Sequence, residues 1–187
     1  MKYLKSLEQR DWDKIDTKVV DREYKVYRTQ LARLKPRLSG TTWKYFWEGF
    51  GPAGIHDARL IALSVGDGLN TLPRHLGAPN KIRIKADFLN QNRKYRFTFS
   101  YSNIERFSFD FDATLGRYLI DLSNDRYFHD ADHYLRCNHL SDVMGDELTP
   151  VDSKCLRHEV VFRSGAHIVV QAARISFHKK LLEEKIS

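Results

Sequence analysis

Apolar and aromatic side chains recur at helical spacing near the start of the chain. Between residues 13 and 34 they step by four, three, four and three positions, at Val20, Tyr24, Tyr27, Leu31 and Leu34. This spacing places them on one face of an α-helix, and the other faces are charged. Pro36 ends the pattern, because the residue before a proline disfavours helical dihedral angles. The sequence predicts an amphipathic helix that docks by one side on its own domain rather than on a partner.

From residue 58 onwards the apolar period changes to two, which is typical of β-strands. The predicted strands are 58–65, 81–88, 95–99, 104–111, a short 118–122, 156–162 and 166–177. Ser102-Asn103 is expected to break the third strand from the fourth, and Ser164-Gly165 is expected to turn a final β-hairpin. Residues 179–185 are charged and predict a short helical end.

Two tryptophans lie in a short aromatic block that separates the helical and strand patterns. Its members are Trp43, Tyr45, Phe46, Trp47 and Phe50, and Gly49, Gly51, Pro52 and Gly54 follow or interrupt it. The favoured interpretation is an apolar plug between helix and sheet. A platform for stacking nucleic-acid bases is the alternative, and it requires exposed rings with nearby Lys or Arg.

These patterns predict a single α+β domain over residues 1–187. We expect an N-terminal helix packed on an antiparallel β-sheet or a small β-sandwich of about six to eight strands. Residues 1–48 form a helical arm and the aromatic plug, and residues 55–178 form the β-rich core. Residues 123–154 are the most polar and irregular part, and whether they form an ordered insertion stays open.

Charge and composition narrow the class of protein. The chain carries 31 Lys and Arg against 24 Asp and Glu, a net charge of +7. No run of 18 apolar residues is present, so no membrane span is expected. The first residues lack the apolar segment of a signal peptide. The two cysteines, Cys137 and Cys155, are interpreted as reduced thiols, so we expect a cytoplasmic protein. We also expect it to need no cofactor.

The basic excess lies mainly in the N-terminal arm and permits an acidic partner, such as nucleic acid. On a strand, alternate residues share one face, so Lys81, Arg83 and Lys85 would all point to the same side and meet phosphates. The predicted helix adds Arg22, Lys25 and Arg28 as candidate binding residues. Acidic residues are interleaved through the arm, which also fits an ordinary solvated helix face.

Three groups of ionisable residues are candidates for chemistry. His56-Asp57 enters the first strand, and His158-Glu159 enters a late one. Both pairs are interpreted as structural, because polar side chains at strand entries satisfy backbone groups. His129, Asp130, Asp132 and His133 have the residue types of metal ligands, but their spacing matches no established metal motif. The sequence therefore assigns no catalytic residue, and a metal-dependent hydrolase is the weakest of three functional hypotheses.

The order of the motifs resembles a group of small, mostly uncharacterised bacterial proteins with a Leu-His-Asp-Ala motif at a strand entry. The resemblance rests on the Trp- and Tyr-bearing helix, on residues 56–60 (His-Asp-Ala-Arg-Leu) and on residues 158–165, and it spans roughly residues 12–178. Ile55 stands where the group usually has Leu. Some members resemble immunity proteins of contact-dependent or polymorphic toxin systems. The resemblance implies a cytoplasmic bacterial protein that acts by binding, and it carries over no catalytic residue.

The leading hypothesis is therefore a non-enzymatic interaction protein, immunity-like, that binds a partner protein such as a toxin. Immunity proteins against nucleases are often acidic, whereas this chain is basic. Either it binds an acidic toxin, or the resemblance to immunity proteins does not determine its function. The alternative is a nucleic-acid-binding module that uses the basic arm and the Lys81, Arg83 and Lys85 face.

Overall fold

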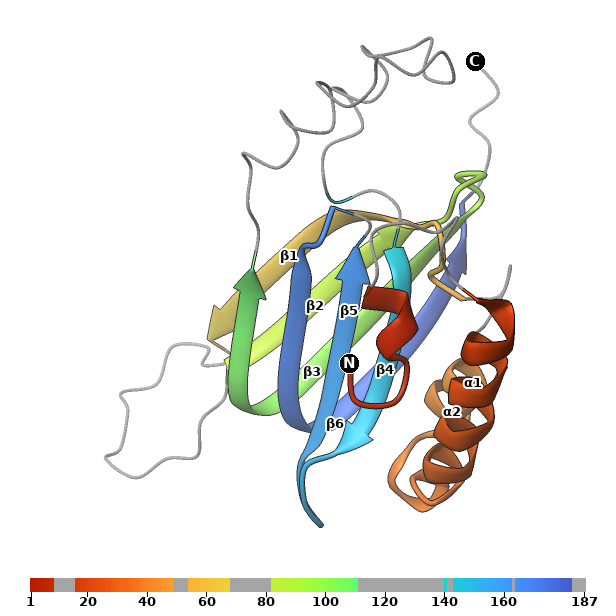
Figure 1. Cartoon of the computed structure of the whole chain (residues 1–187). Coiled ribbons are helices and arrows are strands. Elements are labelled where there is room, and N and C mark those ends of the chain that lie inside the picture. Colours follow the sequence, from red (N-terminus) through yellow and green to blue (C-terminus); the bar gives the residue numbers. More distant parts are fainter. Residues whose placement is uncertain are drawn as a thin grey trace, which may run out of the picture.

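The computed structural model describes residues 1–8, 16–48, 54–67, 82–110, 140, 143–162 and 164–182. Within these residues, short 3-10 helices η1 (Lys5–Glu8) and η3 (Lys35–Arg37) flank α1 (Thr17–Ala32), and α2 (Gly40–Glu48) follows. The strands are β1 (Arg59–Asp67), β2 (Ile82–Leu89), β3 (Tyr95–Asp110), β4 (Val143–Pro150), β5 (Leu156–Phe162) and β6 (His167–Leu181). They form one antiparallel sheet in the order β1-β2-β3-β6-β5-β4, which Figure 1 shows as strongly twisted. The predicted α+β class with an antiparallel sheet is confirmed.

Helix α1 forms where the apolar spacing predicts it. The Asp16 side chain caps its first turn by accepting a hydrogen bond of 2.9 Å from the Lys18 backbone N–H. Tyr27 and Leu31 are buried, as is Leu34 just beyond the helix end. These side chains join the main apolar core, and α1 contacts α2, η1 and β4.

The aromatic block forms α2, so the predicted plug is helical. Tyr45 and Phe46 are buried, and the Tyr45 ring packs on Phe99 and Phe177 at centroid distances of 5.0 and 4.2 Å. Thr42 is also buried, and its hydroxyl accepts a hydrogen bond of 3.1 Å from the Phe177 backbone N–H on β6. Helix α2 thus covers the face of the sheet that carries the aromatic side chains of β3 and β6.

The predicted break at Ser102-Asn103 is wrong, because β3 continues through it to Asp110. Asn103 adopts a left-handed backbone conformation, with φ of 54°. Asparagine tolerates this conformation better than most residues do. Tyr101 and Ile104 on either side are both buried, so the in–out alternation is interrupted while the strand pairing to β6 is kept. The polar dipeptide marks an irregularity within a strand and not its end.

Two further predictions need correction. The predicted helical end at residues 179–185 is wrong at its start, because β6 runs to Leu181. The stretch 123–154, expected to be irregular, contains β4. Its consecutive carboxylates, Asp146 and Glu147, are both largely covered, so burial on this strand does not follow an apolar pattern. The predicted strand 118–122 lies outside the described residues.

The two edge strands of the sheet meet at one end. The Asp57 backbone N–H donates to the Val143 carbonyl at 2.9 Å, and the Val143 N–H donates to the Ala58 carbonyl at 3.0 Å. The Phe88 and Phe162 rings, on β2 and β5, stack at 6.5 Å although two strands separate β2 from β5 in the sheet order. The sheet is therefore curled around its aromatic side chains, which leaves an inner face and an outer face.

Candidate functional site

The outer face of β1, β2, β3 and the C-terminal half of β6 is rich in basic side chains. Strand pairing aligns its residues in four rows: Gly66–Arg83–Ser102–Arg174, Ser64–Lys85–Ser100–Ser176, Ala62–Asp87–Thr98–His178 and Arg59–Leu89–Arg96–Lys180. Six Lys and Arg side chains therefore lie on one surface, which we call the outer basic face: Arg59, Arg83, Lys85, Arg96, Arg174 and Lys180. Arg96 is partly exposed and the other five are exposed.

Asp87 is the one carboxylate in these four rows, and its charge is already matched. It accepts from the Arg96 guanidinium and, at 2.5 Å, from the Thr98 hydroxyl, and Lys85 Nζ lies 3.3 Å away. Burial alone would raise the pKa of Asp87, but the hydrogen bonds from Arg96, Thr98 and Lys85 outweigh it and lower the pKa below its ordinary value. Within the described residues, no carboxylate pairs with Arg59, Arg83, Arg174 or Lys180. The face therefore keeps a strong positive field.

The structure separates the two sets of basic residues that the sequence predicts. Arg83 and Lys85 belong to the outer basic face, whereas Lys81 lies outside the described residues. Arg22, Lys25 and Arg28 are exposed on α1, which packs against β4. Three strands lie between β2 and β4 in the sheet order. Sequence spacing finds the β2 residues but misses those on β1, β3 and β6, because only the strand pairing brings them beside β2.

Two tryptophans of α2 take part in a stack of cations and rings. The Trp43 and Trp47 rings stack at 5.0 Å, with Lys35 over Trp43 at 5.8 Å and Arg28 over Trp47 at 5.5 Å. We call these four residues the tryptophan stack. Exposed rings with nearby cations are what a base-stacking platform requires, but here ring–ring and cation–ring contacts already engage both indoles. Trp47 is still 37% exposed. On α1, Val19 is 37% and Val26 is 48% exposed.

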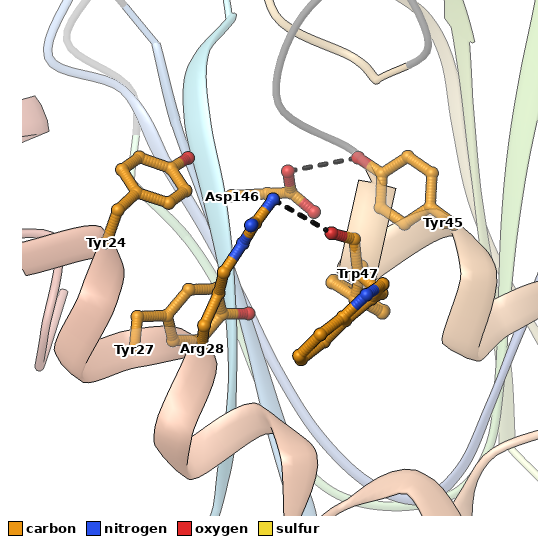
Figure 2. A pocket seen from close by; sticks show the side chains of 7 residues that line it. Tyr24, Tyr27, Arg28, Tyr45, Trp47 and Asp146 are labelled. Carbon is orange, nitrogen blue, oxygen red and sulfur yellow. Dashed lines mark hydrogen bonds between the residues drawn. The ribbon is translucent and has the colours of Figure 1, made fainter. Parts of the chain in front are cut away.

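A small pocket lies between α1, α2 and β4. It is lined by Tyr24, Tyr27, Arg28, Tyr45, Phe46, Trp47 and Asp146, and Figure 2 shows Arg28 reaching across it beside Trp47. The free volume is about 20 Å³. That volume holds about one water molecule, so the pocket has no room for an organic substrate.

A chain of hydrogen bonds leads from this pocket into the core. Tyr45 donates to Asp146 Oδ1 at 3.0 Å, His158 Nε2 lies 2.9 Å from Asp146 Oδ2, and the Tyr101 hydroxyl lies 2.7 Å from His158 Nδ1. All four side chains are satisfied when Nε2–H donates to Asp146 and Nδ1 accepts from Tyr101. Burial, reinforced by the nearby Asp146 charge, raises the pKa of both Tyr45 and Tyr101, so both stay protonated donors.

The bonds of this network lie within the fold. His158 is 1% exposed and both of its ring nitrogens are engaged, so the imidazole presents no free nitrogen at the surface. None of the four side chains is a serine or cysteine nucleophile. The sequence points to His158 but misses Asp146, Tyr45 and Tyr101, which come from distant elements. Cys155 is also buried, and burial raises the pKa of its thiol to about 11, which keeps the thiolate nucleophile scarce.

Two buried glutamates hold the N-terminal segment. Glu147 and Glu159 are cross-strand neighbours on β4 and β5, and both are buried. Glu147 accepts from the backbone N–H groups of Lys2, Tyr3 and Leu4 at 2.5, 2.7 and 3.1 Å. In Figure 1 this segment lies across β4 and β5. Both carboxylates are thus committed to internal hydrogen bonds.

The surroundings of Glu159 predict how the stability of the fold changes at acid pH. It is surrounded by the Met1 amino group at 3.3 Å, Arg157 at 2.8 Å and His167 at 3.6 Å. Burial alone would raise the pKa of Glu159, but these three groups outweigh it and lower the pKa from 4.5 to about 2. A carboxyl with a lowered folded-state pKa stabilises the fold above its unfolded pKa and loses that contribution as the pH falls through the folded one.

We therefore expect about 3 kcal/mol of stability to disappear between pH 4.5 and pH 2. Urea unfolding at several pH values, for the wild type and for Glu159→Gln, measures this. The Gln variant is less stable near neutral pH and loses less stability over the acid range. An identical acid profile for the two proteins contradicts the expectation.

Of the remaining candidates, His56 and Asp57 lie in the part of the chain that the structure describes, and they form no larger reactive group there. His56 Nδ1 lies 3.1 Å from Asp57 Oδ2 in the turn before β1, where Asp57 adopts a φ of 58° and its N–H bonds to Val143. The His129, Asp130, Asp132 and His133 cluster lies outside the described residues. Within the described part of the chain, no three His, Cys, Asp or Glu side chains are grouped to hold a metal. None of the helices described there has the length and apolar character needed to cross a membrane.

Comparisons with known proteins found no matching family model, curated protein or solved structure. The resemblance to the Leu-His-Asp-Ala group therefore stays a prediction, and the functional argument rests on the surfaces and networks described above.

Proposed function

We propose that this chain is a non-enzymatic nucleic-acid-binding protein that uses the outer basic face. The main support is that six Lys and Arg side chains are aligned on one surface. In the four rows that define this surface, the one carboxylate is Asp87, which is already paired. Such a surface neutralises phosphates and releases their counterions on binding. The hydroxyls of Ser64, Ser100, Ser102 and Ser176 lie between the cations and suit phosphate oxygens as well.

The same face is a poor surface for a protein partner. Stable protein interfaces have a desolvated centre of aromatic and aliphatic side chains. In the four rows described above, the central residues are serines, Ala62, Thr98 and Gly66, and the one large apolar side chain, Leu89, is only partly exposed. Nucleic acid, which is bound largely through charge and hydroxyl contacts, therefore fits this face better than a protein does.

Salt dependence tests the proposal. We expect the wild type to bind nucleic acid at low salt, with affinity falling steeply as salt rises. Arg83→Gln combined with Arg174→Gln removes two phosphate contacts, so the slope of log affinity against log salt becomes shallower by about 2. Fluorescence anisotropy with labelled oligonucleotides measures both.

Arg22→Gln combined with Lys25→Gln on α1 is the matched control, because it removes the same charge from a different surface. Its salt slope should stay within about 0.5 of the wild-type slope. No binding by the wild type at low salt contradicts the proposal, and an equal loss in both double variants shows that only net charge matters.

A second candidate function is favoured by the tryptophan stack. Trp and Arg are enriched at the energetic centres of protein interfaces. Here Arg28 lies over the Trp47 ring and Lys35 over the Trp43 ring, and Trp47 itself is 37% exposed. This surface suits an acidic protein partner, such as the toxin that the immunity-like resemblance implies.

Affinity capture with matched variants tests the second candidate. Trp47→Ala should abolish retention of a stable protein partner, whereas Arg83→Gln with Arg174→Gln should leave it unchanged. Retention that is equal for all three proteins, or a partner that nuclease treatment removes, counts against a protein interface at α1 and α2.

A further inference from the structure

The outer basic face has a spatial pattern that specifies the form of nucleic acid it binds. Resting on the proposed function, we propose that this face binds duplex DNA across its major groove and contacts both phosphate backbones. Sequence information would play little part in such binding, because phosphate contacts position a protein without reading bases.

The cations fall into two bands at opposite ends of the face. Arg83 and Arg174 share one end row, with Lys85 in the next row. Arg59, Arg96 and Lys180 share the row at the other end. Six residues separate these end rows along β2, from Arg83 to Leu89, which corresponds to about 20 Å at about 3.4 Å per residue. The B-DNA major groove is about 12 Å wide, so long side chains that lean inward from both bands reach its two rims.

The centre of the face is low and polar. One of its rows holds Ser64, Ser100 and Ser176 beside Lys85, and the next holds Ala62, Thr98 and His178 beside the paired Asp87. Five of these eight side chains are small, so most of the centre lies lower than the rows of Arg and Lys at the two ends. A protein that contacts only the phosphates at the two rims of the major groove does not need to fill the groove. A face with cations at both ends and a low centre therefore suits the two phosphate backbones of a DNA duplex.

Single strands are disfavoured because the face offers no Phe, Tyr or Trp ring for base stacking. Binding of single-stranded nucleic acid depends on aromatic side chains that stack on exposed bases. Phe88, Phe97 and Phe99, on β2 and β3, are buried on the inner face. The four outer rows contain no Phe, Tyr or Trp, and the imidazole of His178 is their one ring. Duplex RNA is disfavoured for a different reason, since its major groove is deep and narrow.

Competition between forms of nucleic acid tests this inference. Probes are a duplex DNA of about two helical turns, or about 20 base pairs, each of its single strands, and a duplex RNA of the same sequence, all at one salt concentration. We expect the DNA duplex to bind at least about tenfold tighter than either single strand or the RNA duplex. Unrelated DNA duplex sequences should bind within about threefold of each other.

Variants of the two bands sharpen the test. Arg83→Gln with Arg174→Gln and Arg59→Gln with Lys180→Gln should each weaken duplex binding about tenfold or more, and Arg22→Gln with Lys25→Gln should not. Thermal unfolding checks that each variant is folded. Equal or tighter binding of single strands or duplex RNA, or sensitivity in one band only, overturns the inference while the proposed function stands. No binding of any probe overturns both.

Discussion

Glu147→Ala is expected to lower the free energy of unfolding by about 3–5 kcal/mol. The Glu147 carboxylate is 1% exposed and accepts three consecutive backbone N–H groups, from Lys2, Tyr3 and Leu4. Alanine leaves the buried Leu4 donor and the part-buried donors of Lys2 and Tyr3 without their acceptor, and each unsatisfied buried donor costs about 1–3 kcal/mol. Chemical denaturation followed by circular dichroism measures the change.

Glu48→Ala is the matched control, because Glu48 makes a single exposed ion pair, 3.9 Å long, with Lys44. Its effect should stay below about 0.5 kcal/mol. Glu147→Gln keeps one acceptor oxygen and should fall between the two. Should Glu147→Ala and Glu48→Ala turn out equally stable, the carboxylate has no part in holding the N-terminal segment.

Asp146→Ala is expected to lower the free energy of unfolding by about 2–4 kcal/mol. The substitution removes the acceptor for the Tyr45 hydroxyl and for His158 Nε2. Neither group has room to move to water, because Tyr45 is 5% and His158 is 1% exposed. The same denaturation experiment measures the loss, and Asp146→Asn should lose less because its amide oxygen still accepts one hydrogen bond.

A double-mutant cycle separates the network from simple loss of a side chain. Tyr45→Phe removes one hydrogen bond to Asp146, and its cost should shrink in the Asp146→Ala background by about 1 kcal/mol. Additive effects of the two substitutions mean that the hydrogen bond between them contributes nothing to stability. Nucleic-acid binding should be unchanged in every folded variant, since Asp146 and Tyr45 lie away from the outer basic face.

Local pattern was enough to find the fold class and most elements. The apolar spacing predicts α1, and strict alternation predicts β2, because each depends on which side of one element is buried. Strand β4 was missed since Asp146 and Glu147 are covered on its two opposite faces, Asp146 by Tyr45 and His158 and Glu147 by the N-terminal segment, so a polar sequence forms a largely buried strand. Asn103 led to the wrong prediction of a break, because it is an exposed polar residue within a continuous strand.

The candidate surface could be predicted only along one strand. Arg83 and Lys85 are two residues apart, so the sequence places them on one face. Arg174 joins them only because β6 pairs with β3, which depends on packing between residues far apart in the chain. The network around His158 is unpredictable for the same reason, since Tyr101 lies 57 residues before His158 and Tyr45 lies 101 residues before its own partner, Asp146.

The hold of Glu147 on the N-terminal segment also sets an order of events during folding. The bond from Lys2 to Glu147 spans 145 residues, and the bond between Asp57 and Val143, which closes the sheet, links residues that are also far apart in the chain. Contacts so distant in sequence form late, because chain closure must precede any gain from them. Leu4, fully buried in the finished protein, therefore stays in water until β4 and β5 are paired. We therefore expect docking of the N-terminal segment to be a late step, and the apolar surface that Leu4 covers to stay exposed until it is complete.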